Sequence, residues 1–141
     1  MKTAFADTLN WVATILPRDQ WCQAAKAART RLGQRIRIVT TEEVLAEFLT
    51  ALSAGGPNIR REAAQMVRAI LADSTVDVVA QSSDSFLSGL YLYERRDDKS
   101  YSLADCISMN TMRSEDITDV LTNDHHFAQE GFDVLISSPT R

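Results

Sequence analysis

The chain has 141 residues, of which 45% are hydrophobic and 24% charged, the ordinary mixture of one globular domain over residues 1–141. This composition excludes a disordered tail, a collagen repeat and a disulfide-stabilised mini-protein. Fifteen Lys and Arg against 19 Asp and Glu give a net charge of −4, which argues against a large non-specific DNA-binding surface.

The first part of the chain alternates strand and helix patterns. A short apolar segment over residues 3–6 predicts a strand, and a helix is expected over residues 8–15. Pro17 is typical of a first helical turn, which predicts an Ala-rich helix over residues 17–31. The β-branched residues 36–39 predict the second strand.

Helical patterns dominate the middle of the chain. Thr40 or Thr41 caps a helix whose first turn is acidic, and its apolar residues recur at helical spacing at Leu45, Phe48, Leu49 and Leu52. Pro57 opens the next helix. The remaining pattern predicts, in order, a strand at 76–79, helices at 82–95 and 102–112, a strand at 119–122, a short helix at 124–130 and a last strand at 132–136.

Strands separated by helices predict an α/β fold, a three-layer α/β/α sandwich with a central, mostly parallel sheet. Ligands of such sheets bind at the carboxyl ends of the strands. Polar residues at the ends of the predicted strands are therefore the first candidates for a functional site.

Four acids stand out. Asp7 directly follows the first predicted strand and Asp124 lies just past the fourth. Asp105 lies in a helix that is apolar nearly all round, and Glu47 lies on the flank of an apolar stripe. Each also has a structural explanation. Asp7 or Thr8 suits the N-cap of one helix and Asn123 or Asp124 that of another, and Glu47 can be an exposed helix residue. Asp105 can form a capping box with Ser102.

The four carboxylates converge in one cleft if the first and fourth strands are neighbours. Like charges raise one another's pKa, and a hard divalent cation such as Mg²⁺ or Mn²⁺ removes this conflict. A cation held by carboxylates in an open cleft suits hydrolysis of a phosphodiester.

The chain resembles the PIN-domain family, the fold of the VapC-type toxins of bacterial toxin–antitoxin modules. The resemblance covers essentially the whole chain and is carried by residues 5–8, 41–47, 101–106 and 121–127. It implies a single PIN-like domain with metal-dependent endoribonuclease activity. The family's catalytic, metal-binding acids map onto Asp7, Glu47, Asp105 and Asp124, and its supporting hydroxyl positions map onto Thr8 and Thr122.

The resemblance also implies partners. These are an RNA substrate such as tRNA or ribosomal RNA, a cognate antitoxin whose C-terminal segment fills the active-site groove, and a second copy in a homodimer. Water is expected to attack the phosphorus in line, leaving 5′-phosphate and 3′-hydroxyl products. The alternative function is a PIN-fold protein-binding or regulatory module without nuclease activity.

Two enzyme classes built on similar sheets fit less well. A haloacid-dehalogenase-type phosphatase requires an acid where Leu9 stands, and a phospho-receiver requires a phospho-acceptor where Ala80 and Gln81 follow the third strand.

Several further residues were considered. Adjacent His125 and His126 point about 100° apart on a helix, so one site would rarely use both. His126 is expected to be structural, and Cys106 to be a small buried hydrophobe. Candidate contacts to the RNA backbone, which can equally be helix-end cations, are Arg95, Arg96, Lys99 and Arg113.

No segment of the sequence is apolar and long enough to span a bilayer, and the first residues lack the apolar run of a secretory signal. The two cysteines, Cys22 and Cys106, form no Cys-x-x-Cys motif. We therefore expect a cytoplasmic protein with free thiols.

Overall fold

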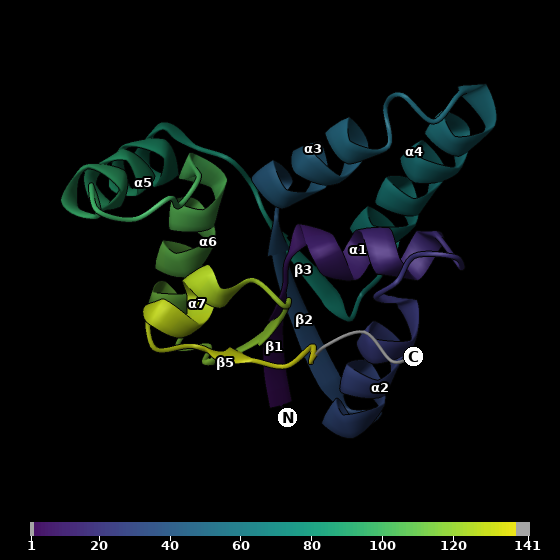
Figure 1. Cartoon of the computed structure of the whole chain (residues 1–141), viewed down its shortest axis with the longest axis horizontal. Coiled ribbons are helices and arrows are strands. Elements are labelled where there is room, and N and C mark those ends of the chain that lie inside the picture. The colour runs from purple at the N-terminus through teal and green to yellow at the C-terminus, as the bar shows by residue number, and fades with distance from the viewer. Residues whose placement is uncertain (1, 138–141) are drawn as a thin grey trace.

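A parallel sheet of five strands forms the centre of the structure, a computed structural model that describes residues 2–137 (Figure 1). The strand order is β3-β2-β1-β4-β5, and every neighbouring pair runs parallel. The strands are β1 (Lys2–Ala6), β2 (Ile36–Thr41), β3 (Val76–Val79), β4 (Asp119–Leu121) and β5 (Asp133–Val134).

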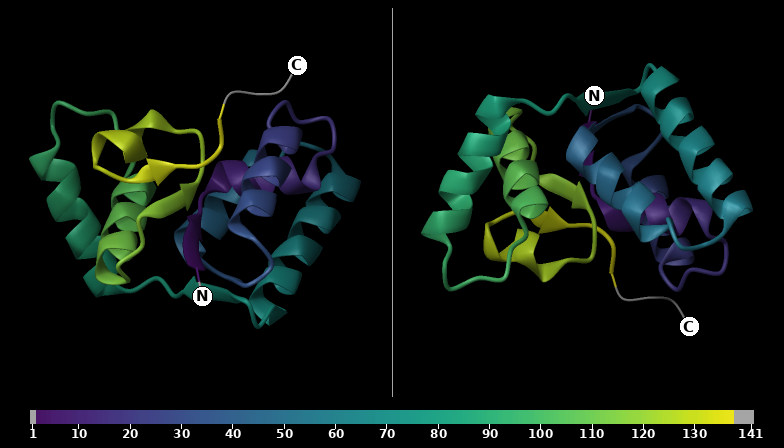
Figure 2. Two further views of the ribbon diagram at one scale, coloured as in Figure 1. Left: turned by 90° about the horizontal axis from the view of Figure 1, so that it is seen from below. Right: turned by 90° about the horizontal axis from the view of Figure 1, so that it is seen from above.

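Helices cover both faces of the sheet, which confirms the predicted α/β/α sandwich. α1 to α4 lie on one side and α5 to α7 on the other (Figures 1 and 2). The helices are α1 (Thr8–Ile15), α2 (Cys22–Leu32), α3 (Glu42–Ala51), α4 (Pro57–Ala72), α5 (Ser83–Arg95), α6 (Leu103–Ser114) and α7 (His125–Gln129). None of the helices in the described part of the chain has the length and apolar character that a membrane span requires.

The hydrophobic core lies on both faces of the neighbouring strands β1 and β4. The last three residues of β1 and the last two of β4 are buried, as expected for strands covered on both sides. Large buried side chains from the sheet and both helical layers fill the core, among them Phe5, Phe48, Met109, Met112, Leu121 and Phe127. On the α1 side the indole Nε1 of Trp11 donates to Thr40 Oγ1 at 3.4 Å, which gives both buried polar groups a partner.

The strand register places the ends of β1 and β4 side by side. Ala6 pairs with Leu121, the last residues of the two strands. The backbone N–H of Asp7 still donates to the carbonyl of Leu121 at 3.3 Å, so the residues that follow the strands also lie together. The predicted condition for convergence of the acids, that the first and fourth strands are neighbours, is therefore confirmed.

Several predicted boundaries were wrong. The helix predicted from Pro17 begins only at Cys22, because Asp19 accepts a hydrogen bond from the backbone of Trp21 and makes a turn there. β4 ends at Leu121 rather than at residue 122, and the strand predicted over residues 132–136 is reduced to Asp133–Val134. The last strand lies at the edge of the sheet, where one-sided pairing limits its length.

Candidate metal centre at the carboxyl edge of the sheet

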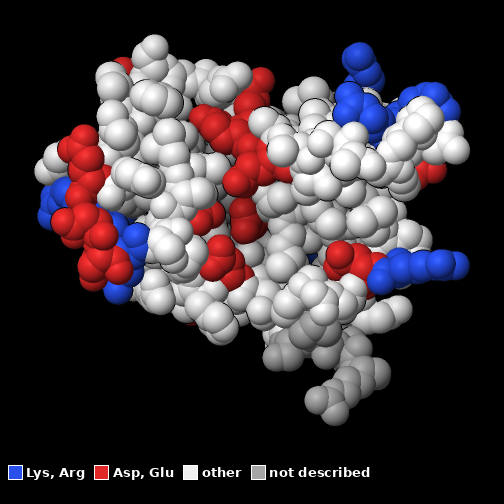
Figure 3. Space-filling model, turned by 45° about the horizontal axis from the view of Figure 1, so that its top comes forward, with Lys and Arg blue, Asp and Glu red and all other residues white. Residues whose placement is uncertain are grey.

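A cleft of about 640 Å³ opens where the central strands end. Its lining contains all four predicted acids, Asp7, Glu47, Asp105 and Asp124, together with Thr8. Figure 3 shows acidic side chains gathered in a hollow on this face of the molecule. The fold thus brings together residues that are more than a hundred positions apart in the sequence.

Asp7 is the most deeply placed of the acids, with only 7% of its surface exposed. It occupies the N-cap position of α1, but its side chain caps nothing and instead accepts a hydrogen bond from Thr122 Oγ1 at 2.9 Å. Burial raises the pKa of Asp7 to about 7 against the lowering effect of this bond, and the neighbouring Asp105 and Glu47 carboxylates raise it further.

Glu47 reaches the cleft from α3. Its Oε1 accepts a hydrogen bond from Thr8 Oγ1 at 2.9 Å. Burial raises the pKa of Glu47, and the charges of Asp105 and Asp124 act in the same direction. The two predicted supporting hydroxyls therefore each hold one carboxylate in place.

Asp105 and Asp124 each cap a helix through a side-chain hydrogen bond and also line the cleft. Asp105 forms the capping box of α6: its backbone N–H donates to Ser102 Oγ at 3.0 Å, and its Oδ2 accepts from the Ser102 backbone at 3.1 Å. Asp124 caps α7 by accepting from the His126 backbone at 2.9 Å. The structural explanations considered for both acids are correct, and the same bonds orient their carboxylates.

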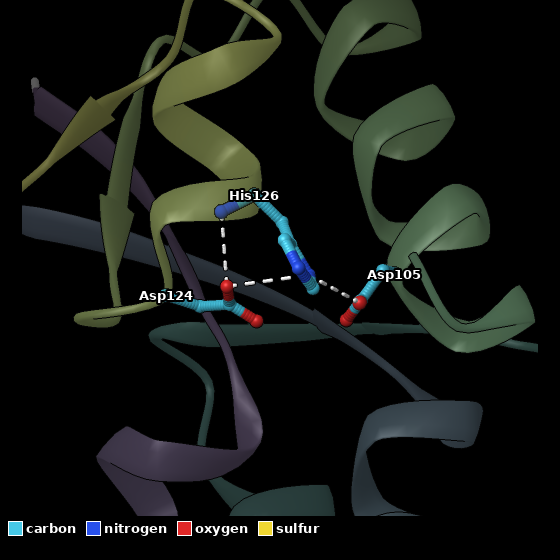
Figure 4. Close-up of side chains that lie close together, drawn as sticks. All are labelled: Asp105, Asp124 and His126. Carbon is cyan, nitrogen blue, oxygen red and sulfur yellow. Dashed lines mark hydrogen bonds and ion pairs between the residues drawn. The ribbon is translucent and has the colours of Figure 1, made fainter. Parts of the chain in front are cut away.

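His126 lies between these two carboxylates (Figure 4). Its Nδ1 is 3.3 Å from Asp105 Oδ2 and 3.3 Å from Asp124 Oδ1. One ligand atom from each of the three residues lies within 4.8 Å of the others, which is a compact group able to hold a metal ion. Sequence reasoning treated His126 as structural, and only its two-residue spacing from Asp124 hinted at this position.

The donor set fits a divalent cation. Within residues 2–137, none of the four acids forms an ion pair with a lysine or arginine, and His126 is the partner of two of them. Carboxylate oxygens suit Mg²⁺ or Mn²⁺, and of these two ions Mn²⁺ accepts an additional imidazole nitrogen more readily. A cation in this cleft would offset both the burial and the mutual repulsion that raise the pKa of Asp7 and Glu47.

The four basic residues predicted to contact RNA fall into two groups in the structure, two that bind a buried acid and two that are exposed. Arg96 and Arg113 both bind Glu130, whose side chain is 5% exposed, at 2.9 and 2.8 Å. The Arg95 guanidinium lies 5.4 Å from the centre of the Tyr91 ring, and Lys99 is 3.6 Å from Asp98. Arg95 and Lys99 are exposed, whereas Arg96 and Arg113 have an internal partner that the sequence did not reveal.

Glu130 is expected to contribute strongly to stability. The hydrogen bond from Arg96, aided by bonds from Arg113 and Tyr101, lowers the pKa of Glu130 to about 2. We expect Glu130→Ala to lower the free energy of unfolding by about 2–3 kcal/mol at pH 7. This is less than the cost of breaking a fully buried pair, because both guanidinium groups are at least one-third exposed.

The contribution of Glu130 to stability is expected to depend on pH. A depressed pKa stabilises the fold above the ordinary glutamate value of 4.5, and this contribution is lost as pH falls toward 2. The difference between wild type and Glu130→Ala in urea unfolding should therefore shrink between pH 5 and pH 2. The exposed Glu94 of α5 supplies the matched Glu94→Ala control, and equal stability of both variants at pH 7 would contradict the assignment.

Comparisons with known proteins are consistent with this geometry. The family model described as "PIN domain" matches residues 4–132. The chain is similar to the crystal structure of VapC20 from Mycobacterium tuberculosis, which is described as a Sarcin-Ricin loop cleaving toxin. The two share 27% sequence identity at a TM-score of 0.80, over 96% of this chain and 99% of that one. A search of curated proteins gave no match.

Proposed function

This chain belongs to the PIN domain family, and from that premise we propose that it is a metal-dependent endoribonuclease, the toxin of a toxin–antitoxin pair. The observation that carries the proposal is the convergence of Asp7, Glu47, Asp105 and Asp124 in one cleft. The similarity to a toxin that cleaves the Sarcin-Ricin loop supports RNA as the substrate, with ribosomal RNA or tRNA as the class.

The carboxylates have distinct tasks in this proposal. Asp105 of α6 and Asp124 at the cap of α7 would hold the cation, and Asp7 and Glu47, which line the same cleft, would complete the site. Bound Mg²⁺ or Mn²⁺ supplies charge neutralisation at the scissile phosphate and activation of the attacking water. Thr122 and Thr8 orient Asp7 and Glu47 through hydrogen bonds of 2.9 Å. Water attacks the phosphorus in line, and the products carry 5′-phosphate and 3′-hydroxyl ends.

The protein partners are a cognate antitoxin and a second copy of the chain. α5 exposes several large apolar side chains, half or more of each accessible to solvent, at Phe86, Leu87, Tyr91 and Tyr93. Exposed apolar groups clustered on one helix are typical of an interaction surface. Arg95 and Lys99 are the proposed contacts to the RNA backbone, and the cytoplasm is the proposed site of action.

The purified protein is expected to cleave cellular RNA with Mn²⁺ or Mg²⁺ and to lose this activity in EDTA. Gel analysis and mapping of the product ends test this directly. Products that end in 2′,3′-cyclic phosphate would contradict attack by water. Absence of cleavage together with absence of divalent-ion binding in calorimetry would overturn the proposal. The apolar surface of α5 would then favour the alternative, a protein-binding module.

A further inference from the structure

His126 offers the candidate metal centre a nitrogen donor besides its carboxylates. We propose that Nδ1 of His126 is a direct ligand of the divalent cation, together with Asp105 and Asp124, and that this mixed donor set makes the site select Mn²⁺ over Mg²⁺. The inference rests on the proposed function, whose metal requirement it refines.

The spacing of the donor atoms matches a coordination sphere. Ligands at right angles around a small divalent cation, each about 2.1 Å from it, are about 3 Å apart. The imidazole Nδ1 is 3.3 Å from one oxygen of each carboxylate, and the three atoms lie within 4.8 Å of one another. A cation can therefore enter between them with only small movements of the side chains.

The second ring nitrogen has a partner that suits this role. Nε2 of His126 lies 3.2 Å from Ser100 Oγ. A metal-binding histidine typically donates its other ring N–H to a neighbouring oxygen, which fixes the tautomer and the ring orientation. With the proton on Nε2 donated to Ser100, the lone pair of Nδ1 faces the carboxylate oxygens.

A neighbouring aromatic ring also restricts the orientation of the His126 imidazole. The ring of Tyr101 packs against that of His126 with centroids 5.0 Å apart. The hydroxyl of Tyr101 donates to Glu130 Oε2 at 3.0 Å, and Glu130 is in turn fixed by Arg96 and Arg113. This chain of contacts ties residues 100–101 to the short helix α7 and so preorganises the imidazole against the two carboxylates.

Donor chemistry predicts the selectivity. Mg²⁺ strongly prefers oxygen ligands, whereas imidazole nitrogen suits first-row transition metals. We expect His126→Asn to weaken Mn²⁺ binding about 10-fold or more and Mg²⁺ binding much less. The ratio of the two affinities, measured by titration, should therefore fall toward one in the variant.

Pulsed electron paramagnetic resonance of the Mn²⁺-loaded protein tests ligation without reference to activity. We expect nitrogen hyperfine modulation from a directly bound imidazole in the wild type and its loss in His126→Asn. The neighbouring His125 is exposed, so His125→Asn is the matched control and should retain the signal. His126→Gln is a second variant in case the asparagine disturbs α7.

The outcomes separate this inference from the proposed function. If Mn²⁺ binds the wild type without nitrogen coupling, or if His126→Asn keeps the coupling, His126 is not a ligand and the carboxylate site alone stands. If the wild type binds no Mn²⁺ at all, both the inference and the metal dependence of the proposed function are overturned.

Discussion

Replacing Asp105 by asparagine is expected to lower the rate of RNA cleavage at least about 100-fold. Loss of a group that only orients a metal ligand already costs about 10–100-fold, and Asp105 is itself a proposed ligand. The fold should survive the change. The amide oxygen of asparagine can still accept from the Ser102 backbone, so the capping box of α6 remains. We therefore expect the free energy of unfolding to change by less than about 1 kcal/mol.

The measurement compares initial cleavage rates of wild type and Asp105→Asn on the same RNA at saturating Mn²⁺, with unfolding in urea as the parallel assay. Asp97 is an exposed acid in the connection between α5 and α6, so Asp97→Asn is the matched control and should retain full activity. Equal activity of the two variants would show that Asp105 serves only as a cap.

The fold could be predicted from the sequence because its signals are local. Buried β-branched strands, helix caps and Pro57 at a helix start all act over a few residues, and the alternation of strands and helices then favours a parallel sheet. Convergence of Asp7 and Asp124 also follows from chain direction, since every parallel strand delivers its next residue to the same edge. The helix start at Pro17 failed because a local Asp19 turn competes with helix initiation there.

The remaining features depend on side chains that meet only through packing. The ring of His126 meets Asp105 because α7 lies beside the first turn of α6, and no sequence spacing relates Asp105 to a histidine 21 positions away. The ion pairs of Arg96 and Arg113 with Glu130 could not be predicted from the sequence either. A basic residue near a helix end gives the same sequence pattern whether it binds RNA or a buried acid. Composition and periodicity carry no information on such pairings.

Asp7 illustrates a conflict between stability and function that can be measured. We expect Asp7→Asn to be inactive yet more stable than the wild type by about 2–4 kcal/mol at pH 8 without metal. The wild-type carboxyl has a pKa raised to about 7 in the fold, against an ordinary value of 3.8. Ionising it inside the protein therefore costs up to about 4 kcal/mol.

The sign of the pH dependence follows from the raised pKa. Below pH 3.8 the Asp7 carboxyl is protonated in both the folded and the unfolded chain and imposes no penalty. As pH rises from about 4 through 7, the unfolded state loses its proton first, and wild-type stability falls relative to the asparagine variant. The two proteins should have similar free energies of unfolding at pH 4 and diverge by pH 8.

Urea unfolding of wild type and Asp7→Asn from pH 4 to pH 8 in EDTA tests this directly, with Asp97→Asn as the exposed control that should track the wild type. Added Mn²⁺ should then stabilise the wild type more than the Asp7→Asn variant, because a ligand stabilises the state that binds it, and stabilises it more the tighter it binds. A variant less stable than the wild type at pH 8 would show that the Thr122–Asp7 hydrogen bond outweighs the burial of the charge. The opposite result, higher stability with lost activity, would show that the fold retains this costly carboxylate for the cation.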